Sequence, residues 1–177
     1  MDQAEAAGTL PRAADRRPGN GLATEGGSGA VARRVAAIAA SALLLVWPAF
    51  WNGYPLVFAD TGTNLGQALI VYLGWDRPPF YSVFLLATHW GLSLWGPVIV
   101  QGLIVAHLLE LVLRVLGRPE PRALLLAAAG LAVFTGLPWV TAQLIPDVFT
   151  GVVLLSLWLV GFRWACLSRP ERWWMLL

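Results

Sequence analysis

The chain of 177 residues has no lysine, a single cysteine and only two histidines. One thiol excludes an internal disulfide and any thiol-pair motif, so we interpret Cys166 as a space-filling helix residue. The histidines show no metal-ligand spacing, and the sequence contains neither a phosphate-cradling glycine loop nor a nucleophile elbow. The signatures of the common soluble enzyme classes are therefore missing, and nothing in the sequence suggests nucleic-acid binding.

Charge is also scarce, at 12% of residues, whereas 58% are hydrophobic and the mean hydropathy is +0.66. Several apolar runs approach the roughly 20 residues that a helix needs to cross a bilayer. This composition predicts an integral membrane protein whose fold class is all-α, a polytopic helix bundle with the lipid bilayer as its surroundings.

Residues 1–34 have a different composition, with small residues, glycine, proline and charges of both signs. They offer too little apolar surface to offset the entropy lost on ordering. We predict a disordered cytoplasmic tail over 1–34 and a transmembrane domain over 35–177. The first apolar run begins at Val35, too late for a secretory signal, which favours an uncleaved first span.

Four transmembrane helices are predicted from the strongest apolar runs, over residues 35–51, 96–116, 123–137 and 147–162. The run Phe80 to Trp95 is ambiguous, because prolines precede it and glycines surround its end. If it does not cross the membrane, eleven of the twelve arginines lie on the cytoplasmic side. The positive-inside tendency therefore favours an interfacial or re-entrant helix there.

The resulting topology has a cytoplasmic N-terminus in a bacterial cytoplasmic membrane, a large outer loop over 52–95 with interfacial helices, and a small outer turn over 138–146. The final "RWWMLL" is typical of the start of another membrane-contacting segment, so we expect the chain to be cut short. The charges on the outer face are few, namely Asp60, Asp76, Arg77 and Asp147.

Asp60 lies in "FADTGTNL", where leucines then recur at helical spacing. One interpretation is that Asp60 or Thr61 caps this amphipathic helix. The other is that Asp60 is a general base or a metal ligand that faces a cavity at membrane level. A cap and an active carboxylate are compatible with each other.

Asp76 and Arg77 belong to "DRPPFY", where two prolines set the chain up to start a helix. They form either an interfacial ion pair, with Tyr81 in the aromatic belt, or a site where Arg77 binds an anionic phosphate. Asp147 heads the last span, where the helix dipole favours a carboxylate. A carboxylate beside a bundle interior is also a candidate functional group.

Two further polar positions lie among apolar residues. Glu110 is four residues before Arg114, so a structural ion pair is the simpler interpretation. His89 fits a hydrogen-bonding residue at headgroup level better than a catalyst, and an interfacial acyltransferase with His89 as base lacks an acid partner at helical spacing.

The order of these motifs resembles the N-terminal part of GT-C type membrane glycosyltransferases, such as the protein mannosyltransferases and the lipid A aminoarabinose transferases. Asp60 in "FADTGTNL" matches the family's first acid, "RPPFYSVFLL" matches its "PPLYY"-like sequence, and Asp147 matches a second acid at the head of a later span. The resemblance covers roughly residues 35–165. Thr61 and Asn64 stand where many relatives have a second acid and an aromatic residue.

The resemblance implies transfer of a sugar from a polyprenyl-phosphate donor at the outer membrane face. Asp60 would deprotonate or orient the acceptor hydroxyl or hold a divalent metal, and Asp147 would orient the acceptor or complete a metal site. Arg77 and His89 would hold the donor phosphate, with Asp76 and Tyr81 as further substrate-binding residues. The alternative is a non-catalytic multi-pass membrane subunit or a transporter fragment, although a transporter is expected to place charges near the midplane of its spans.

Overall fold

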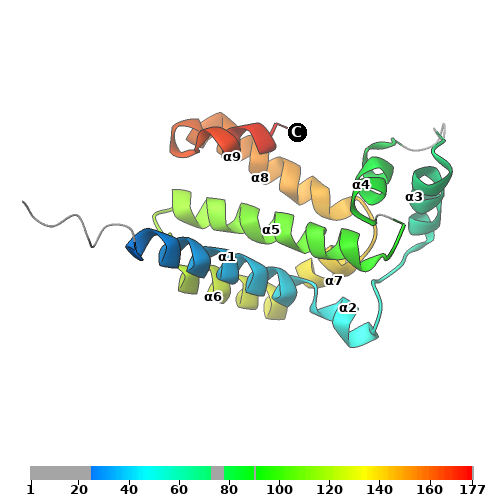
Figure 1. The fold of residues 1–177 in the computed structure, drawn as a ribbon, viewed down its shortest axis with the longest axis horizontal. Helices are drawn as coiled ribbons and strands as arrows, with labels where there is room; N and C mark the ends of the chain where they lie inside the picture. The colour runs from blue at the N-terminus through cyan, green and yellow to red at the C-terminus, as the bar shows by residue number, and fades with distance from the viewer. Residues whose placement is uncertain (1–24, 73–77, 90, 177) are drawn as a thin grey trace, which may run out of the picture.

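The computed structural model describes residues 25–72, 78–89 and 91–176 of the chain (Figure 1). Their regular elements are helices, and an isolated parallel β-bridge joins Leu56 and Gln143. The helices are α1 (Glu25–Leu45), α2 (Trp47–Asn52), α3 (Ala59–Ile70), α4 (Phe80–His89), α5 (Trp95–Val115), α6 (Pro121–Phe134), α7 (Leu137–Ala142), α8 (Asp147–Arg163), the short 3-10 helix η1 (Trp164–Cys166) and α9 (Arg169–Trp174).

Three of the described helical segments are long and apolar enough to cross a membrane: Ser28–Leu45, Trp95–Val115 and Asp147–Cys166. They have 18, 21 and 20 residues, close to the roughly 20 that a bilayer core of about 30 Å requires. The protein is therefore an α-helical membrane protein. Helix α6 is also apolar but has only 14 residues, which corresponds to about 21 Å at about 1.5 Å per residue.

The first helix differs from its prediction at both ends. It begins at Glu25, so residues 25–34, which we predicted as part of the disordered tail, are helical. The alanine-rich sequence that follows favours continuation of the helix toward the N-terminus. The helix ends at Leu45 rather than at Trp51, because Pro48 lacks an N–H and its ring would clash with the carbonyl of Leu44 in a continuous helix. A separate helix, α2, follows.

The bundle is formed by α1 packed against α5 and α6, with α8 on the other side of α5 (Figure 1). Gly102 permits the close approach of α5 to α1. A Cβ atom at this position would lie 2.8 Å from Cγ1 of Val46 and 3.2 Å from the carbonyl oxygen of Ala42. Small residues let helix backbones approach in this way in membrane proteins.

The segment between α1 and α5 forms a helical layer at one end of the bundle, where α3 and α4 lie side by side (Figure 1). Helix α4 has 10 residues, too few to cross a bilayer, as expected for an interfacial helix. A short connection leads to α5, whose start packs closely against the end of α4, because a Cβ atom at Gly96 would clash with the carbonyl oxygen of Thr88. The predicted small turn over 138–146 contains a helix of its own, α7.

The two ends of the bundle differ in charge. The described arginines lie in α1, at the end of α5, in the α5–α6 connection, at the start of α6, at the end of α8 and in α9: Arg33, Arg34, Arg114, Arg118, Arg122, Arg163, Arg169 and Arg172. The junctions that carry most of them are at the end drawn on the left in Figure 1, whereas α3, α4 and the start of α8 are at the right. The bundle thus has an arginine-rich end and an opposite end, which carries Asp60 and Asp147.

Candidate functional site

The two acid-bearing segments are joined by backbone hydrogen bonds. The N–H of Leu56 donates to the carbonyl of Ala142 (3.0 Å), and the N–H of Leu144 donates to the carbonyl of Leu56 (2.9 Å). This short β-type contact holds the chain before α3 against the chain before α8. It therefore brings the starts of these two helices to the same end of the bundle.

Asp60 lies in the first turn of α3 and is partly buried. Thr61 has the capping role that we considered for this helix start. Its hydroxyl accepts a hydrogen bond from the N–H of Phe58 (2.9 Å) and donates one to the carbonyl of Leu144 (2.9 Å). The Thr61 side chain thus caps the start of α3 and attaches it to the segment that leads into α8. The dipole of α3 favours the negative charge of Asp60 in its first turn.

Asp147 is the first residue of α8 and is exposed. It follows Leu144 by three residues, and Leu144 is the residue whose carbonyl binds Thr61. The chain therefore places the two carboxylates that the sequence singled out on neighbouring helix starts. Asp76 and Arg77, the other two charges predicted for this face, lie outside the described residues.

Tyr81 is buried in the core rather than exposed in an aromatic belt. Its hydroxyl donates to Oε1 of Gln101 (3.2 Å), and Nε2 of Gln101 donates to the carbonyls of Thr141 and Gln143, both at 2.9 Å. Burial raises the pKa of the Tyr81 hydroxyl above its usual value. Tyr81 thus connects α4 with α5 and, through Gln101, with α7, a structural role that its sequence neighbours did not indicate.

His89 is the last residue of α4 and is also buried, at 7% of its full exposure. Its Nδ1 atom accepts a hydrogen bond from the backbone N–H of Gly91. The side chain lines an open hollow of about 210 Å³ between α3 and the start of α5.

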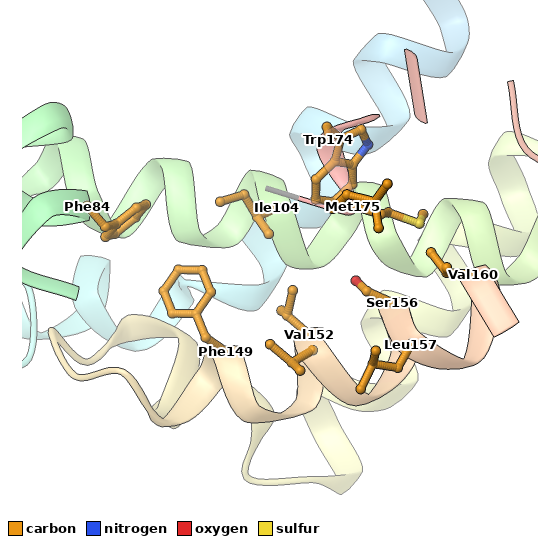
Figure 2. A pocket seen from close by; sticks show the side chains of 11 residues that line it. Phe84, Ile104, Phe149, Val152, Ser156, Leu157, Val160, Trp174 and Met175 are labelled. Carbon is orange, nitrogen blue, oxygen red and sulfur yellow. The ribbon is translucent and has the colours of Figure 1, made fainter. Parts of the chain in front are cut away.

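A larger apolar groove of about 430 Å³ runs between α5 and α8 (Figure 2). Phe84 and Phe149 lie at one end, and Trp174 and Met175 of the C-terminal segment lie at the other. Its wall on α8 extends from Phe149 to Val160, a helix length of about 16 Å. The hydroxyl of Ser156 points into this otherwise apolar space (Figure 2).

No sequence pattern predicts this groove, because most of its lining residues are apolar residues of the kind that fill any interface between helices. At the end of the groove where Phe84 and Phe149 lie, Phe149 follows Asp147 by about half a helical turn of α8. One end of the groove therefore lies near the start of α8, at the end of the bundle that carries the two carboxylates.

The opposite end carries a network of ion pairs. Arg34 of α1 contacts Glu110 of α5 at 2.7 Å, and Arg114 of α5 contacts Glu171 of α9 at 2.6 Å. The expected pair of Glu110 with Arg114 is present but longer, at 4.0 Å, and His107 lies 3.9 Å from Glu110. The carboxylates are nearly buried, so the network attaches both α1 and α9 to α5.

Glu171 also completes a cap for α9, where the backbone N–H of Ser168 donates to its carboxylate (2.8 Å). The motif "SRPE" is a capping box, a signal that was readable in the sequence. Burial raises the pKa of the Glu171 carboxyl, but the hydrogen bonds from Ser168 and Arg114 lower it more, to about 2. The carboxylate is therefore charged at neutral pH and holds α9 in place.

A metal ion is one of the roles considered for Asp60. Among the described residues, no group of three or more histidine, cysteine, aspartate or glutamate side chains converges to hold one. Comparisons with protein-family models, with curated proteins and with solved structures found no match.

Proposed function

We propose that this protein is a membrane glycosyltransferase that moves a sugar from a polyprenyl-phosphate donor to an acceptor hydroxyl at the outer face of a bacterial cytoplasmic membrane. The observation that supports this proposal most is the groove between α5 and α8, which is apolar along about 16 Å of α8 and ends near Asp147. A polyprenyl chain in the groove would place its phosphate-linked sugar beside the starts of α3 and α8.

The chemistry assigned to this site is an inverting displacement. The acceptor oxygen attacks the anomeric carbon while the bond from that carbon to the phosphate oxygen breaks, and polyprenyl phosphate leaves with the bonding electrons. Asp60 takes the proton of the acceptor hydroxyl. Asp147 stabilises the positive charge that develops on the sugar ring or orients the acceptor. A divalent metal would bind at Asp60 if the reaction uses one.

The proposed topology has α1, α5, α6 and α8 as four crossings, with the arginine-rich end in the cytoplasm. Helix α6 is the short member of the four. Helix α6, Thr135 and helix α7 together carry the chain back to the end of the bundle where Asp147 lies.

The test uses the full chain in proteoliposomes with synthetic polyprenyl-phosphate mannose or polyprenyl-phosphate aminoarabinose, each labelled in the sugar. Released polyprenyl phosphate is measured, with bacterial membrane extract as the acceptor source. We expect Asp60→Asn to lower the rate at least about hundredfold, because general-base catalysis contributes about 10²–10⁴. Glu120→Gln is the matched control, since Glu120 is an exposed acid at the arginine-rich end. Full activity of Asp60→Asn would refute the proposal.

The second candidate is a non-catalytic membrane subunit. The observation that favours it is that both acids lie in first helical turns, where the helix dipole stabilises a carboxylate by about 0.3–1 kcal/mol without any catalytic role. In that case neither donor would be consumed, and Asp60→Asn would change only the stability of the protein.

A further inference from the structure

The chain turns back on itself after α8, where η1 leads into α9 (Figure 1). We call residues 162–173 the elbow. It is anchored to the bundle, because Leu167 is buried at 3% of its full exposure and belongs to a core cluster with Leu159 and Trp174. The membrane-length segment Asp147–Cys166 ends inside the elbow, so the elbow lies where the chain leaves the hydrocarbon core and meets the lipid head groups.

The elbow carries three arginines, and its only acid is already paired. Arg163 and Arg169 are exposed, and Arg172 is partly exposed. Arg169 and Arg172 are three positions apart on α9, where like charges lie close together and repel each other. Glu171 is buried, and its carboxylate contacts Arg114 of α5 at 2.6 Å. Among the described residues, none of the three elbow arginines forms an ion pair, so the protein does not compensate their charge.

Aromatic rings accompany these charges. The guanidinium carbon of Arg172 lies 4.8 Å from the centroid of the Trp164 ring, a cation–π contact that holds the side chain over η1. Phe162 and Trp173 are 79% and 72% exposed. Tryptophan and arginine at the end of a span are typical of the membrane–water interface, where the ring lies among lipids and the charge reaches the head groups. The rings therefore place the arginines beside lipids rather than beside a soluble partner.

We propose that the elbow binds the phosphate group of an anionic phospholipid, with Arg163, Arg169 and Arg172 as its counter-charges. The planar fork of a guanidinium donates two parallel hydrogen bonds to phosphate oxygens, which a point charge cannot do. A zwitterionic head group is a poorer ligand, because its own ammonium group repels the arginines. Binding at the elbow is independent of the proposed sugar transfer, since Asp60 and Asp147 lie at the opposite end of the bundle.

The experiment uses the only cysteine of the chain as a reporter, since Cys166 is exposed within the elbow. The full chain, with a fluorophore on Cys166, is reconstituted in phosphatidylcholine bilayers. Spin-labelled phosphatidylglycerol or spin-labelled phosphatidylcholine is added, with the label near the glycerol end of one acyl chain, where it quenches the fluorophore only at short range. We expect phosphatidylglycerol to quench more strongly at equal mole fraction, because the elbow concentrates it. The ratio of the two association constants measures this preference.

Replacement of the elbow arginines should reduce the preference. We expect Arg163→Gln and Arg169→Gln each to lower the ratio about three- to fivefold, since one basic residue near an anionic membrane surface contributes an attraction of that size. The matched control is Arg33→Gln combined with Arg122→Gln. It removes two exposed arginines from α1 and α6, which pack on the other side of α5, and should leave the ratio unchanged.

Equal quenching by the two lipids in the wild type would overturn the inference. So would an equal loss of preference in the control variant, because the attraction would then be a diffuse property of the arginine-rich end. Displacement of phosphatidylglycerol by inorganic phosphate would assign the elbow to a soluble anion. Displacement by poly-L-glutamate at the same ionic strength would assign it to an acidic protein, and either result would also overturn the inference.

A measurement with all arginines intact covers the case in which a variant does not fold. In Leu92→Cys combined with Cys166→Ser, the fluorophore lies at the opposite end of the bundle, where Leu92 is 84% exposed. We expect no preference for phosphatidylglycerol there, and we expect the preference at Cys166 to fall as the salt concentration rises, since salt screens exposed charges. The same preference at Leu92, or a preference at Cys166 that salt does not change, would overturn the inference.

Discussion

At the scale of single residues, the buried amide of Gln101 organises the end of the bundle that carries the candidate site. It is fully buried in α5, accepts from Tyr81 and donates to two carbonyls of the α7–α8 segment. Those carbonyls flank the strand-like contact with Leu56, which positions the start of α3. A single polar side chain inside an apolar helix thus holds α4, α5 and α7 together.

We expect Gln101→Leu to lower the free energy of unfolding by about 1–3 kcal/mol, since it leaves two buried carbonyls and one hydroxyl without their partner. The lower end of this range applies if the unfolded chain in the membrane finds other partners. Unfolding by SDS in mixed micelles measures the effect. Leu103→Ala on the exposed side of α5 serves as control and should change stability less. An unchanged unfolding midpoint for Gln101→Leu would contradict the role we assign to this residue.

At the scale of elements, α9 closes the groove at the arginine-rich end. Trp174 lines the main groove and a second apolar hollow on α5, and its ring lies 5.3 Å from that of His107. The helix has only six residues, too few to be stable alone. Its position therefore depends on the ion pairs of Glu171 and on the burial of Trp174 and Met175 against α5 and α8.

The attachment of α9 should depend on pH through Glu171. Its folded pKa, about 2, is below the usual value of 4.5, so the carboxylate contributes stability above pH 4.5 and loses that contribution as the pH falls toward 2. We expect hydrogen exchange in residues 169–176 to accelerate between pH 4.5 and pH 2, after correction for intrinsic rates. Glu171→Gln should show fast exchange at neutral pH and little further change on acidification. Equal protection in both proteins at pH 7 would show that the ion pair does not hold α9.

At the scale of the whole molecule, the distribution of charge gives the bundle a direction. The helix junctions with most of the described arginines are at one end, and the acids of the candidate site are at the other. The only cysteine, Cys166, is exposed between α8 and α9 at the arginine-rich end. It is therefore a natural reporter of orientation.

We expect Cys166 to react with a membrane-impermeant maleimide only after the cell membrane is permeabilised, because arginine-rich flanks remain in the cytoplasm. Leu92→Cys in a Cys166→Ser background is the matched control, since Leu92 is 84% exposed at the opposite end. It should react in intact cells. Labelling of Cys166 in intact cells would reverse the proposed topology.

The sequence by itself determined that the protein is an α-helical membrane protein, and it predicts the sidedness of the bundle. Long apolar runs can satisfy their backbone groups in a bilayer only as helices, and scarce charges cluster at the ends of those runs, so both features are local. The short helix α4 followed from the same pattern. The premature end of α1 at Leu45 was readable from Pro48, and α9 was readable from the capping box that begins at Ser168.

Only the tertiary structure decided which polar groups meet. The pairing of Leu56 with the chain at 142–144, the contact of Thr61 with Leu144 and the hydrogen bonds from Gln101 to the α7–α8 segment join residues that are 40 or more positions apart. Such contacts leave no periodic signal, because each depends on one side chain and on the path of the backbone. The groove and the hollow beside His89 arise for the same reason, since they are spaces left by the packing of helices rather than properties of any one helix.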